Sequence, residues 1–564
     1  MKRGSVKTSS HYPFMAILAI VIIVSAVYSN SFTGSWHYDD FHHIKQNLSV
    51  RKISNLPLFF YDPSTFSGDP SARMYRPLLM ASYAVNYQLA QIISGDGYAV
   101  SEYHILNFLF HLLATMGVFL IVFFLLQRNT TINPLPAAIF SGLLFGLHPV
   151  NAETVVYISA RSSGLATMFA FFAFYIYARE TARTPVRFTP LVMSAFLYLC
   201  GLMTKEIVIV LPVLILYYEL LLNRAWMKAQ PPLEVIKILM GRLLPFLLAS
   251  GSYLWIRHIV LGENLYATLT SRGGSAAAPD FTSQLATQAK VWVIYIREIL
   301  WPTSLSIDKS LTVSRHFSDP TVILSLIILS VIIAVAIGIR KKHPLVTFGT
   351  LWFFTALLPT SLFRLNVAMN DHRLYLGSLG AVLVATQVPS FLFRKNRSEN
   401  GAIIKVFYAI CLAILILLGT NTFHRNMVFA TDETLWKDVL KNNPDSLRAN
   451  QALGYFYWQD WRLRESYIFF KKALALGPEK PETHINMAAV LKDLGKTQAA
   501  LEELKTAVRL SPNDPDVHFN LARLYRFMGD RGAALTEYRQ TLLLNPRHSL
   551  AMSELRKLSG TGIP

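Results

Sequence analysis

The chain has 564 residues, 52% of them hydrophobic, and a mean hydropathy of +0.36, which argues against an ordinary soluble globular protein. Its 53 Lys and Arg outnumber its 34 Asp and Glu, giving a net charge of +19. Because these cations cluster in short loops between apolar runs, they indicate orientation in a membrane and contact with anionic lipid, so no nucleic-acid partner is expected. Cys200 and Cys411 both lie in apolar runs and predict no disulfide framework.

Eleven apolar runs are long enough, or nearly long enough, to cross a bilayer. They lie at residues 13–29, 103–126, 136–148, 154–178, 189–203, 207–222, 242–261, 320–339, 345–362, 374–394 and 402–421. We interpret the first run as a retained membrane helix, because no signal-peptide cleavage site follows it. The sequence therefore predicts an all-α, polytopic membrane domain over residues 1–421.

Basic residues assign the two sides of this membrane domain. They precede the first run and follow the fourth, sixth, eighth and tenth: Lys2, Arg3, Lys7, Arg179, Arg183, Arg187, Arg224, Lys228, Arg340, Lys341, Lys342, Arg394, Lys395 and Arg397. With eleven spans, all of these residues face the cytoplasm. The N-terminus is then cytoplasmic, and everything after the last span lies outside.

One further apolar segment, residues 282–301, carries Lys290, Arg297 and Glu298. Counting it as a span would move the basic cluster at residues 340–342 to the outside. We therefore expect this segment to be an amphipathic helix lying on the outer surface of the membrane.

Two large loops, residues 30–102 and 262–319, are predicted on the outer side, and the first contains Asp39 and Asp40. Adjacent carboxylates are costly to keep together, because like charges raise one another's pKa. One of the two is suited to act as a general base on an incoming hydroxyl while the other orients it. The competing interpretation of an isolated Asp-Asp pair is an exposed acidic loop.

More polar and charged side chains border the apolar runs on the same side. They are Arg76 in the first loop, His104, Asn107 and His111 in the second run, His148 at the end of the third, Glu153, Tyr157 and Arg161 in the fourth, Lys205 and Glu206 between the fifth and sixth, and Asp371, His372 and Arg373 at the start of the tenth. The spacing places His104 and His111 on one helix face, and places Glu153 and Arg161 on one side of another helix, about 12 Å apart.

A single ionisable residue of this kind is more often a satisfied structural group, but six clusters on one side point to a functional site. The basic side chains Arg76, Arg161, Lys205 and Arg373 suit a phosphate or pyrophosphate on a lipid. These features predict transfer of a group from a lipid-phosphate carrier, without a nucleotide. A bound metal is left open, because two adjacent aspartates can hold a divalent ion but no third carboxylate is clearly assigned to it.

The C-terminal part carries an internal repeat. Pro444, Pro478, Pro512 and Pro546 follow one another at steps of 34 residues, the tetratricopeptide (TPR) period. The same step relates three sets of positions: Gly454, Ala488 and Ala522; Ser466, Ala500 and Ala534; Phe470, Leu504 and Tyr538. Residues 445–564 are therefore expected to form a short α-solenoid with three repeats and a C-terminal helix, after a connection at 422–444 that holds a degenerate repeat helix. Such an array either binds a peptide or partner helix or serves as a stabilising cap.

Taken in order, these motifs resemble a known family. They are Tyr38-Asp39-Asp40, Tyr75-Arg76-Pro77, His148-Pro149-Val150 with Glu153, Arg161, Thr204-Lys205-Glu206, and His372-Arg373-Leu374-Tyr375-Leu376 with Ser378-Leu379-Gly380, followed by the repeats. The pattern resembles the transmembrane and tetratricopeptide repeat-containing O-mannosyltransferases and their bacterial relatives, over nearly the whole chain. Two positions depart from it: Gly377 stands where proline is expected, and Ser162-Ser163 where an acidic residue is expected.

The resemblance implies a GT-C glycosyltransferase that uses a polyprenyl-phosphate sugar and modifies a protein hydroxyl, with the repeats presenting the acceptor. It implies that Asp39 and Asp40 are the acidic motif and that Arg76, Arg161 and Arg373 are donor-phosphate positions. Transfer to a glycan or to lipid A, and a non-catalytic membrane-anchored scaffold, are the alternatives. The short basic loops favour a bacterial inner-membrane protein with periplasmic repeats, whereas a eukaryotic member would place them in the ER lumen.

Overall fold

The computed structural model describes residues 11–69, 72–129, 133–262, 280–309, 311–363, 367–389 and 401–559. Within these ranges the chain forms helices and turns and no strand, as predicted for an all-α protein. It divides into two units, Met1–Ala430 and Thr431–Pro564. Six of the basic residues used to assign the membrane sides, Lys2, Arg3, Lys7, Arg394, Lys395 and Arg397, lie outside the described residues.

Each of the eleven predicted apolar runs contains an α-helix. These helices are α1 (His11–Tyr28), α3 (Val100–Asn129), α4 (Leu135–Gly146), α6 (Arg161–Thr181), α7 (Phe188–Leu202), α8 (Leu211–Leu221), α9 (Pro232–Leu261), α12 (Pro320–Gly338), α13 (Pro344–Leu362), α14 (Ser378–Ala385) and α16 (Gly401–Val428). Within the described ranges, α1, α3, α12, α13 and α16 are long and apolar enough to cross a membrane, and α4 with the short helix after it makes a sixth if that bent pair is one span. This indicates a multi-pass membrane protein, and the count of eleven spans stays a prediction.

The predicted fourth run does not form one helix. A short turn at Pro149–Asn151 leads into α5 (Ala152–Val156), and a second short turn at Ile158–Ala160 precedes α6. Tyr157 between them is extended, with φ −90° and ψ 113°, so the prediction that Glu153, Tyr157 and Arg161 share one side of a helix was wrong.

A side chain from another helix satisfies the backbone at the break at Tyr157. The side-chain amide of Asn107 on α3 donates to the carbonyl groups of Val155, Tyr157 and Ile158, at 3.3, 3.5 and 3.4 Å. Irregular backbone at membrane depth is tolerated where protein groups satisfy it in this way.

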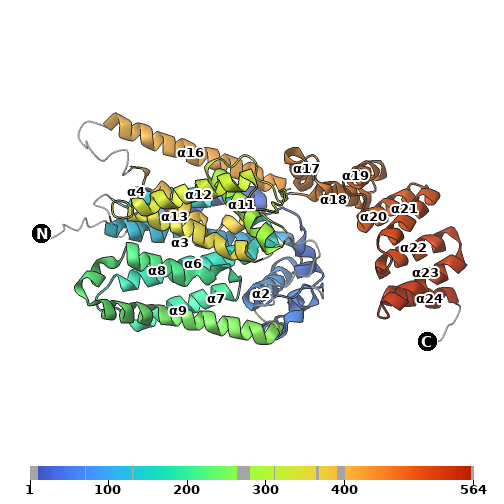
Figure 1. Ribbon diagram of the computed structural model, residues 1–564, viewed down its shortest axis with the longest axis horizontal. Helices are drawn as coiled ribbons and strands as arrows, with labels where there is room; N and C mark the ends of the chain where they lie inside the picture. The colour runs from blue at the N-terminus through green and yellow to red at the C-terminus, as the bar shows by residue number, and fades with distance from the viewer. Residues whose placement is uncertain are drawn as a thin grey trace. The chain divides into compact units, whose positions relative to one another are not determined.

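Two helices lie outside the predicted runs and gather at one end of the first unit, α2 (Pro77–Ser94) and α11 (Phe281–Leu300) (Figure 1). Helix α2 covers a small core of short turns from residues 41–66. Helix α11 is the amphipathic segment predicted at 282–301, and it is not among the helices apolar enough to span. Its Val291 and Tyr295 pack against Phe354 and Leu357 of α13. The turns that join α8 to α9 and α12 to α13 lie at the opposite end.

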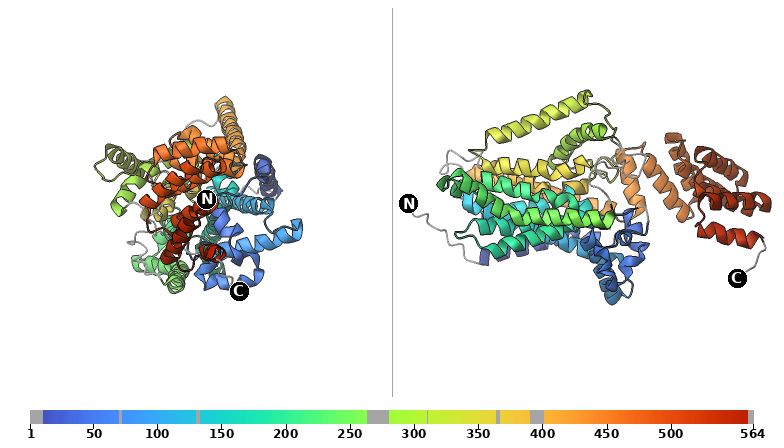
Figure 2. Two further views of the ribbon diagram at one scale, coloured as in Figure 1. Left: turned by 90° about the vertical axis from the view of Figure 1, so that its right-hand side faces the viewer. Right: turned by 60° about the horizontal axis from the view of Figure 1, so that its bottom comes forward.

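The second unit is a stack of helix pairs with the predicted 34-residue repeat (Figure 2). After α17 (Asp432–Asn442) come the pairs α18 (Leu447–Gln459) with α19 (Leu463–Leu476), α20 (Pro481–Asp493) with α21 (Thr497–Leu510), and α22 (Pro515–Met528) with α23 (Arg531–Leu544), and then α24 (Ser549–Ser559). The predicted small positions are buried, and a Cβ added at Gly454 would come within 2.9 Å of the Phe470 ring. Close approach of paired helices therefore explains the small residues.

Candidate functional site

The first candidate element is the turn that carries Asp39 and Asp40. Asp40 is fully buried, and its carboxylate accepts hydrogen bonds from the His37 N–H at 2.9 Å and from the Ser159 N–H and hydroxyl at 2.8 and 2.5 Å. Burial raises the pKa of Asp40 to about 6, against the lowering effect of these hydrogen bonds. Asp40 thus joins the loop after α1 to the irregular segment before α6.

Asp39 lies in a different environment, with 56% of its side chain exposed. Its Oδ1 is 3.3 Å from Nε2 of His42, and its N–H donates to the Tyr157 hydroxyl at 3.3 Å. Burial alone would raise the pKa of Asp39, but the hydrogen bond from His42 and the charges of His43 and His42 lower it to about 2. The expectation that the two carboxylates raise each other's pKa was therefore wrong for Asp39, which stays ionised beside solvent.

A second group of charges lies where α7 meets α8. Arg76, at the start of α2, forms a bidentate ion pair with Glu206, with Nε and Nη2 at 3.1 and 2.9 Å from the two carboxylate oxygens. The guanidinium fork suited to a phosphate is thus already occupied by a carboxylate. Arg76 is also close enough to His43 for its charge to lower the pKa of that imidazole, after burial and the charge of His42.

Arg161 has a structural role, because its hydrogen bonds join neighbouring helices. Its side chain is 1% exposed and makes four hydrogen bonds: to the Asn107 and Asn86 side chains at 2.5 and 2.6 Å and to the carbonyl groups of Tyr103 and Ser82 at 3.2 and 3.3 Å. The guanidinium also lies over the Tyr83 and Tyr103 rings. These contacts join α2 and α3 to the start of α6 and leave little capacity for a phosphate.

This assignment predicts the effect of Arg161→Met. The change leaves Asn86 and Asn107 without their buried partner, so it should lower the free energy of unfolding by about 2–5 kcal/mol. Thermal unfolding of the protein in detergent, followed by tryptophan fluorescence, measures the loss. Arg373→Met is the matched control, because that guanidinium donates only to backbone carbonyls, and it should unfold near the wild-type temperature. Equal unfolding temperatures for Arg161→Met and wild type would show that Arg161 does not hold these helices together.

Lys205 and Arg373 are two further candidate residues without a paired carboxylate among the described residues. Lys205 Nζ donates to the Ser163 hydroxyl at 2.7 Å, and Arg373 donates to the carbonyl groups of Ala368 and Val367 at 3.0 and 2.8 Å. Neither has an acidic side chain within ion-pair distance in the part of the chain that the structure describes. The charges of Arg76, Arg373 and Glu153 all act on Lys205, so these groups share one region.

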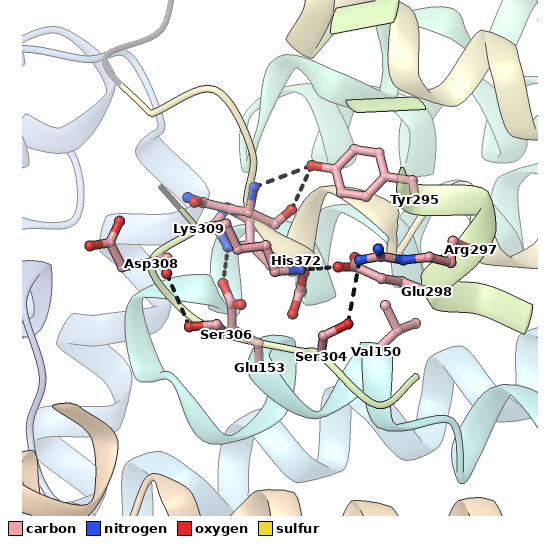
Figure 3. A network of polar contacts seen from close by, with 12 residues as sticks. Val150, Glu153, Tyr295, Arg297, Glu298, Ser304, Ser306, Asp308, Lys309 and His372 are labelled. Carbon is pink, nitrogen blue, oxygen red and sulfur yellow. Dashed lines mark hydrogen bonds and ion pairs between the residues drawn. The ribbon is translucent and has the colours of Figure 1, made fainter. Parts of the chain in front are cut away.

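Next to these cations lies a network of paired charges (Figure 3). His372 Nδ1 is 2.6 Å from one oxygen of Glu153, and among the described residues the other, buried oxygen of Glu153 has no hydrogen-bond partner. Lys309 bridges Glu298, at 2.5 Å, and Asp371. The pair between Lys309 and Asp371 fixes the segment that also carries His372 and Arg373.

Three predicted histidines have structural roles. His111 contacts the Tyr375 hydroxyl at 2.6 Å and the Gly146 carbonyl at 3.0 Å, and His148 contacts the Ile299 carbonyl at 2.9 Å while its other ring nitrogen accepts from Val150 N–H. His104 is buried and packs against Gly34. All three contacts join helices to loops at the end of the unit where α2 and α11 lie.

Several residues of the site were not singled out from the sequence. His42 and His43 follow the carboxylates within one short turn, and Lys309 comes from the second of the two loops that were predicted on the outer side. A basic residue in a predicted outer loop was the available signal for Lys309, but its partners Glu298 and Asp371 lie 11 and 62 residues away. Ser163, noted only as a departure from the expected acidic residue, is the hydrogen-bond partner of Lys205.

Comparison with known proteins matches both parts of the chain. The families described as TPR repeat and Tetratricopeptide repeat match residues 490–529 and 515–548. Protein O-mannosyl-transferase TMTC3 of Homo sapiens is 24% identical over 86% of this chain and 54% of its own length, and TMTC4 of Homo sapiens is 23% identical over 78% and 64%. A crystal structure of MamA is matched at 23% identity over 23% of this chain and 75% of that one, with a TM-score of 0.21.

The predicted resemblance to this family of O-mannosyl-transferases with TPR repeats is therefore confirmed, as a distant relationship over most of the chain. The chain spans between about half and two thirds of the length of these curated relatives.

Proposed function

From its relationship to the TMTC proteins, we propose that this chain is a membrane glycosyltransferase that moves a sugar, mannose or one like it, from a polyprenyl-phosphate carrier to a hydroxyl group of a protein. The observation that carries the proposal is the pair of Lys205, which is buried, and Arg373, which is partly buried, since both cations lack a paired carboxylate among the described residues. A membrane protein retains such charges at a cost, and an anionic ligand is the reason to retain them.

The donor phosphate would bind between these two cations. Lys205 uses one of its N–H donors on Ser163, and Arg373 faces Tyr295 and the carbonyl groups of residues 367 and 368. Both can still donate to phosphate oxygens, and positive charge there stabilises the negative charge that builds on the leaving phosphate. The bidentate pair of Arg76 with Glu206 borders this site and holds the start of α2 against it.

The sugar and the acceptor would lie between the cations and the Asp39 turn. The unpartnered oxygen of Glu153 suits a sugar hydroxyl, because it is a buried acceptor that lacks a donor among the described residues. Asp39 is the exposed, ionised carboxylate of the first outer loop and suits the acceptor hydroxyl. Asp40 is excluded from direct contact by its three hydrogen bonds.

We further propose that the protein lies in a bacterial inner membrane with its N-terminus in the cytoplasm and the TPR unit in the periplasm. The basic turns after α8 and α12, which carry Arg224 and Arg340, lie at the end of the first unit opposite α2 and α11, in keeping with that orientation. The TPR unit would hold the acceptor protein, since TPR arrays bind peptides or partner helices.

Deleting residues 431–564 tests this division of labour, because the first unit forms its own core. With purified protein in nanodiscs and a radiolabelled polyprenyl-phosphate mannose donor, the truncated chain should keep transfer to a short hydroxyl-containing peptide and lose transfer to the folded acceptor. The reason is that tethering makes the second encounter intramolecular and raises the effective concentration of the acceptor.

The full chain is the control in the same assay. Loss of both activities on truncation would identify the repeats as a stabilising cap. Absence of transfer and of donor hydrolysis in the full chain, with an intact fold, would contradict the enzyme and favour a membrane-anchored scaffold.

A further inference from the structure

Three side chains at the Asp39 turn have the spacing of a metal site. The ligand atoms of Asp39, His42 and His43 all lie within 4.8 Å of one another, and Asp39 Oδ1 is 3.3 Å from His42 Nε2. Ligands of a tetrahedral zinc ion at about 2.1 Å are separated by roughly 3.4 Å. The Asp39–His42 pair already has that separation, and the widest pair has to close by at most roughly 1.4 Å.

The backbone of this turn is unusual in a way that brings the three residues together. Phe41–Lys45 forms a single π-helical turn, an element that occurs often at functional sites. Just before it, Tyr38 has a positive φ of 47°, a conformation that a bulky side chain rarely adopts. Such strain persists only where surrounding contacts enforce it, here the Asp40 carboxylate on His37 and Ser159.

In both His42 and His43, the ring nitrogen Nδ1 lies near a serine hydroxyl group. Nδ1 of His42 is 2.9 Å from the Ser67 hydroxyl, which leaves Nε2 facing Asp39. His43 is buried with its ring on Phe66, at 4.8 Å between centroids, and its Nδ1 lies 3.5 Å from the Ser159 hydroxyl. A second hydrogen bond that fixes the ring and its tautomer is the usual companion of a metal-binding histidine.

We propose that Asp39, His42 and His43 bind a divalent transition metal of the zinc class. Two imidazoles with one carboxylate favour such a metal over Mg²⁺ or Ca²⁺, which prefer all-oxygen sites. Asp40 is not a ligand, since three donors fill its carboxylate, so the metal does not use the adjacent aspartate pair. The exposure of Asp39 leaves an outward coordination position for water or for an oxygen of a ligand.

Metal binding would also complete the proposed transfer reaction. An acceptor hydroxyl bound at the open position would become more acidic. Its oxygen would form the new bond to the sugar as the bond between the sugar and the carrier phosphate breaks, its proton would pass to water, and the phosphate would leave with the carrier lipid. This role rests on the proposed function, whereas the binding of the metal does not.

Zinc binding to the purified full-length chain tests the site without donor or acceptor. After chelator treatment and addition of Zn²⁺ in nanodiscs, we expect about one tightly bound zinc per chain by elemental analysis, and calorimetry gives its affinity. His42→Ala and Asp39→Asn should each weaken binding at least about a hundredfold, as loss of a ligand exceeds the 10–100-fold effect of an outer partner. His316→Ala, at an exposed histidine elsewhere in the outer loops, should bind as wild type does.

His43→Gln should lose the same site, but His43 is buried and that variant is judged only if its unfolding temperature is unchanged. The variants of His42, which is partly exposed, and of Asp39, which is exposed, decide the test whatever the behaviour of His43→Gln. Absence of stoichiometric zinc, or zinc binding that His42→Ala and Asp39→Asn leave unchanged, would overturn the site. Because the readout is bound metal, an inactive protein that binds zinc through these residues would contradict the proposed function and not the metal site.

Discussion

Replacing Lys205 with Met, or Arg373 with Gln, should each lower the rate of sugar transfer by about 10²–10³-fold while leaving the protein folded. Both side chains are cations without a paired carboxylate among the described residues, and a donor phosphate would supply the missing negative charge. The stability of each variant should be equal to or greater than that of wild type, because an uncompensated buried charge is costly in the absence of its ligand.

The combination of lost activity and retained stability separates ligand binding from a structural role. Lys290→Met is the matched control, since Lys290 also belongs to the predicted outer side but donates only to the Thr312 carbonyl. Its transfer rate should equal that of wild type. If Lys205→Met and Arg373→Gln transferred sugar at the wild-type rate, the phosphate would have to bind elsewhere.

The two aspartates should respond differently to the same isosteric change. Asp39→Asn removes the charge of an exposed carboxylate and should cut transfer by about a hundredfold or more, with the unfolding temperature unchanged. Asp40→Asn replaces a carboxylate that accepts three buried hydrogen bonds, and its amide cannot accept all of them, so it should destabilise the protein by about 1–3 kcal/mol.

Parallel transfer assays and thermal unfolding of the two variants give the comparison. Wild-type transfer by Asp39→Asn would take the acceptor away from this turn. A stable Asp40→Asn variant with lost transfer would instead place Asp40, and not Asp39, in contact with the reacting groups.

The fold was predictable where it depends on sequence periodicity. The 34-residue step predicted the array of three TPR helix pairs, because each repeat buries the same small positions, such as Ala488 and Ala522. The amphipathic segment 282–301 was likewise predictable, since it combines apolar residues with Lys290, Arg297 and Glu298. The break at Tyr157 was not, because it depends on a carboxamide from α3 that caps the freed carbonyls.

The members of the candidate site could be predicted, but not their partners. Arg76, Arg161 and Arg373 look alike in sequence as basic residues near the predicted outer side. In the structure, Arg76 pairs with a carboxylate and Arg161 donates to carboxamides. Arg373 contacts backbone carbonyls and a tyrosine. The side-chain partners of Arg76 and Arg161 lie 54 to 130 residues away in the sequence, and no local pattern encodes them.

A structure of the full chain in nanodiscs with bound polyprenyl phosphate tests the central claim most directly. The account predicts the phosphate within hydrogen-bond distance of Lys205 Nζ and the Arg373 guanidinium, beside Ser163. A phosphate bound elsewhere, with Lys205 and Arg373 keeping only their present partners, would contradict it.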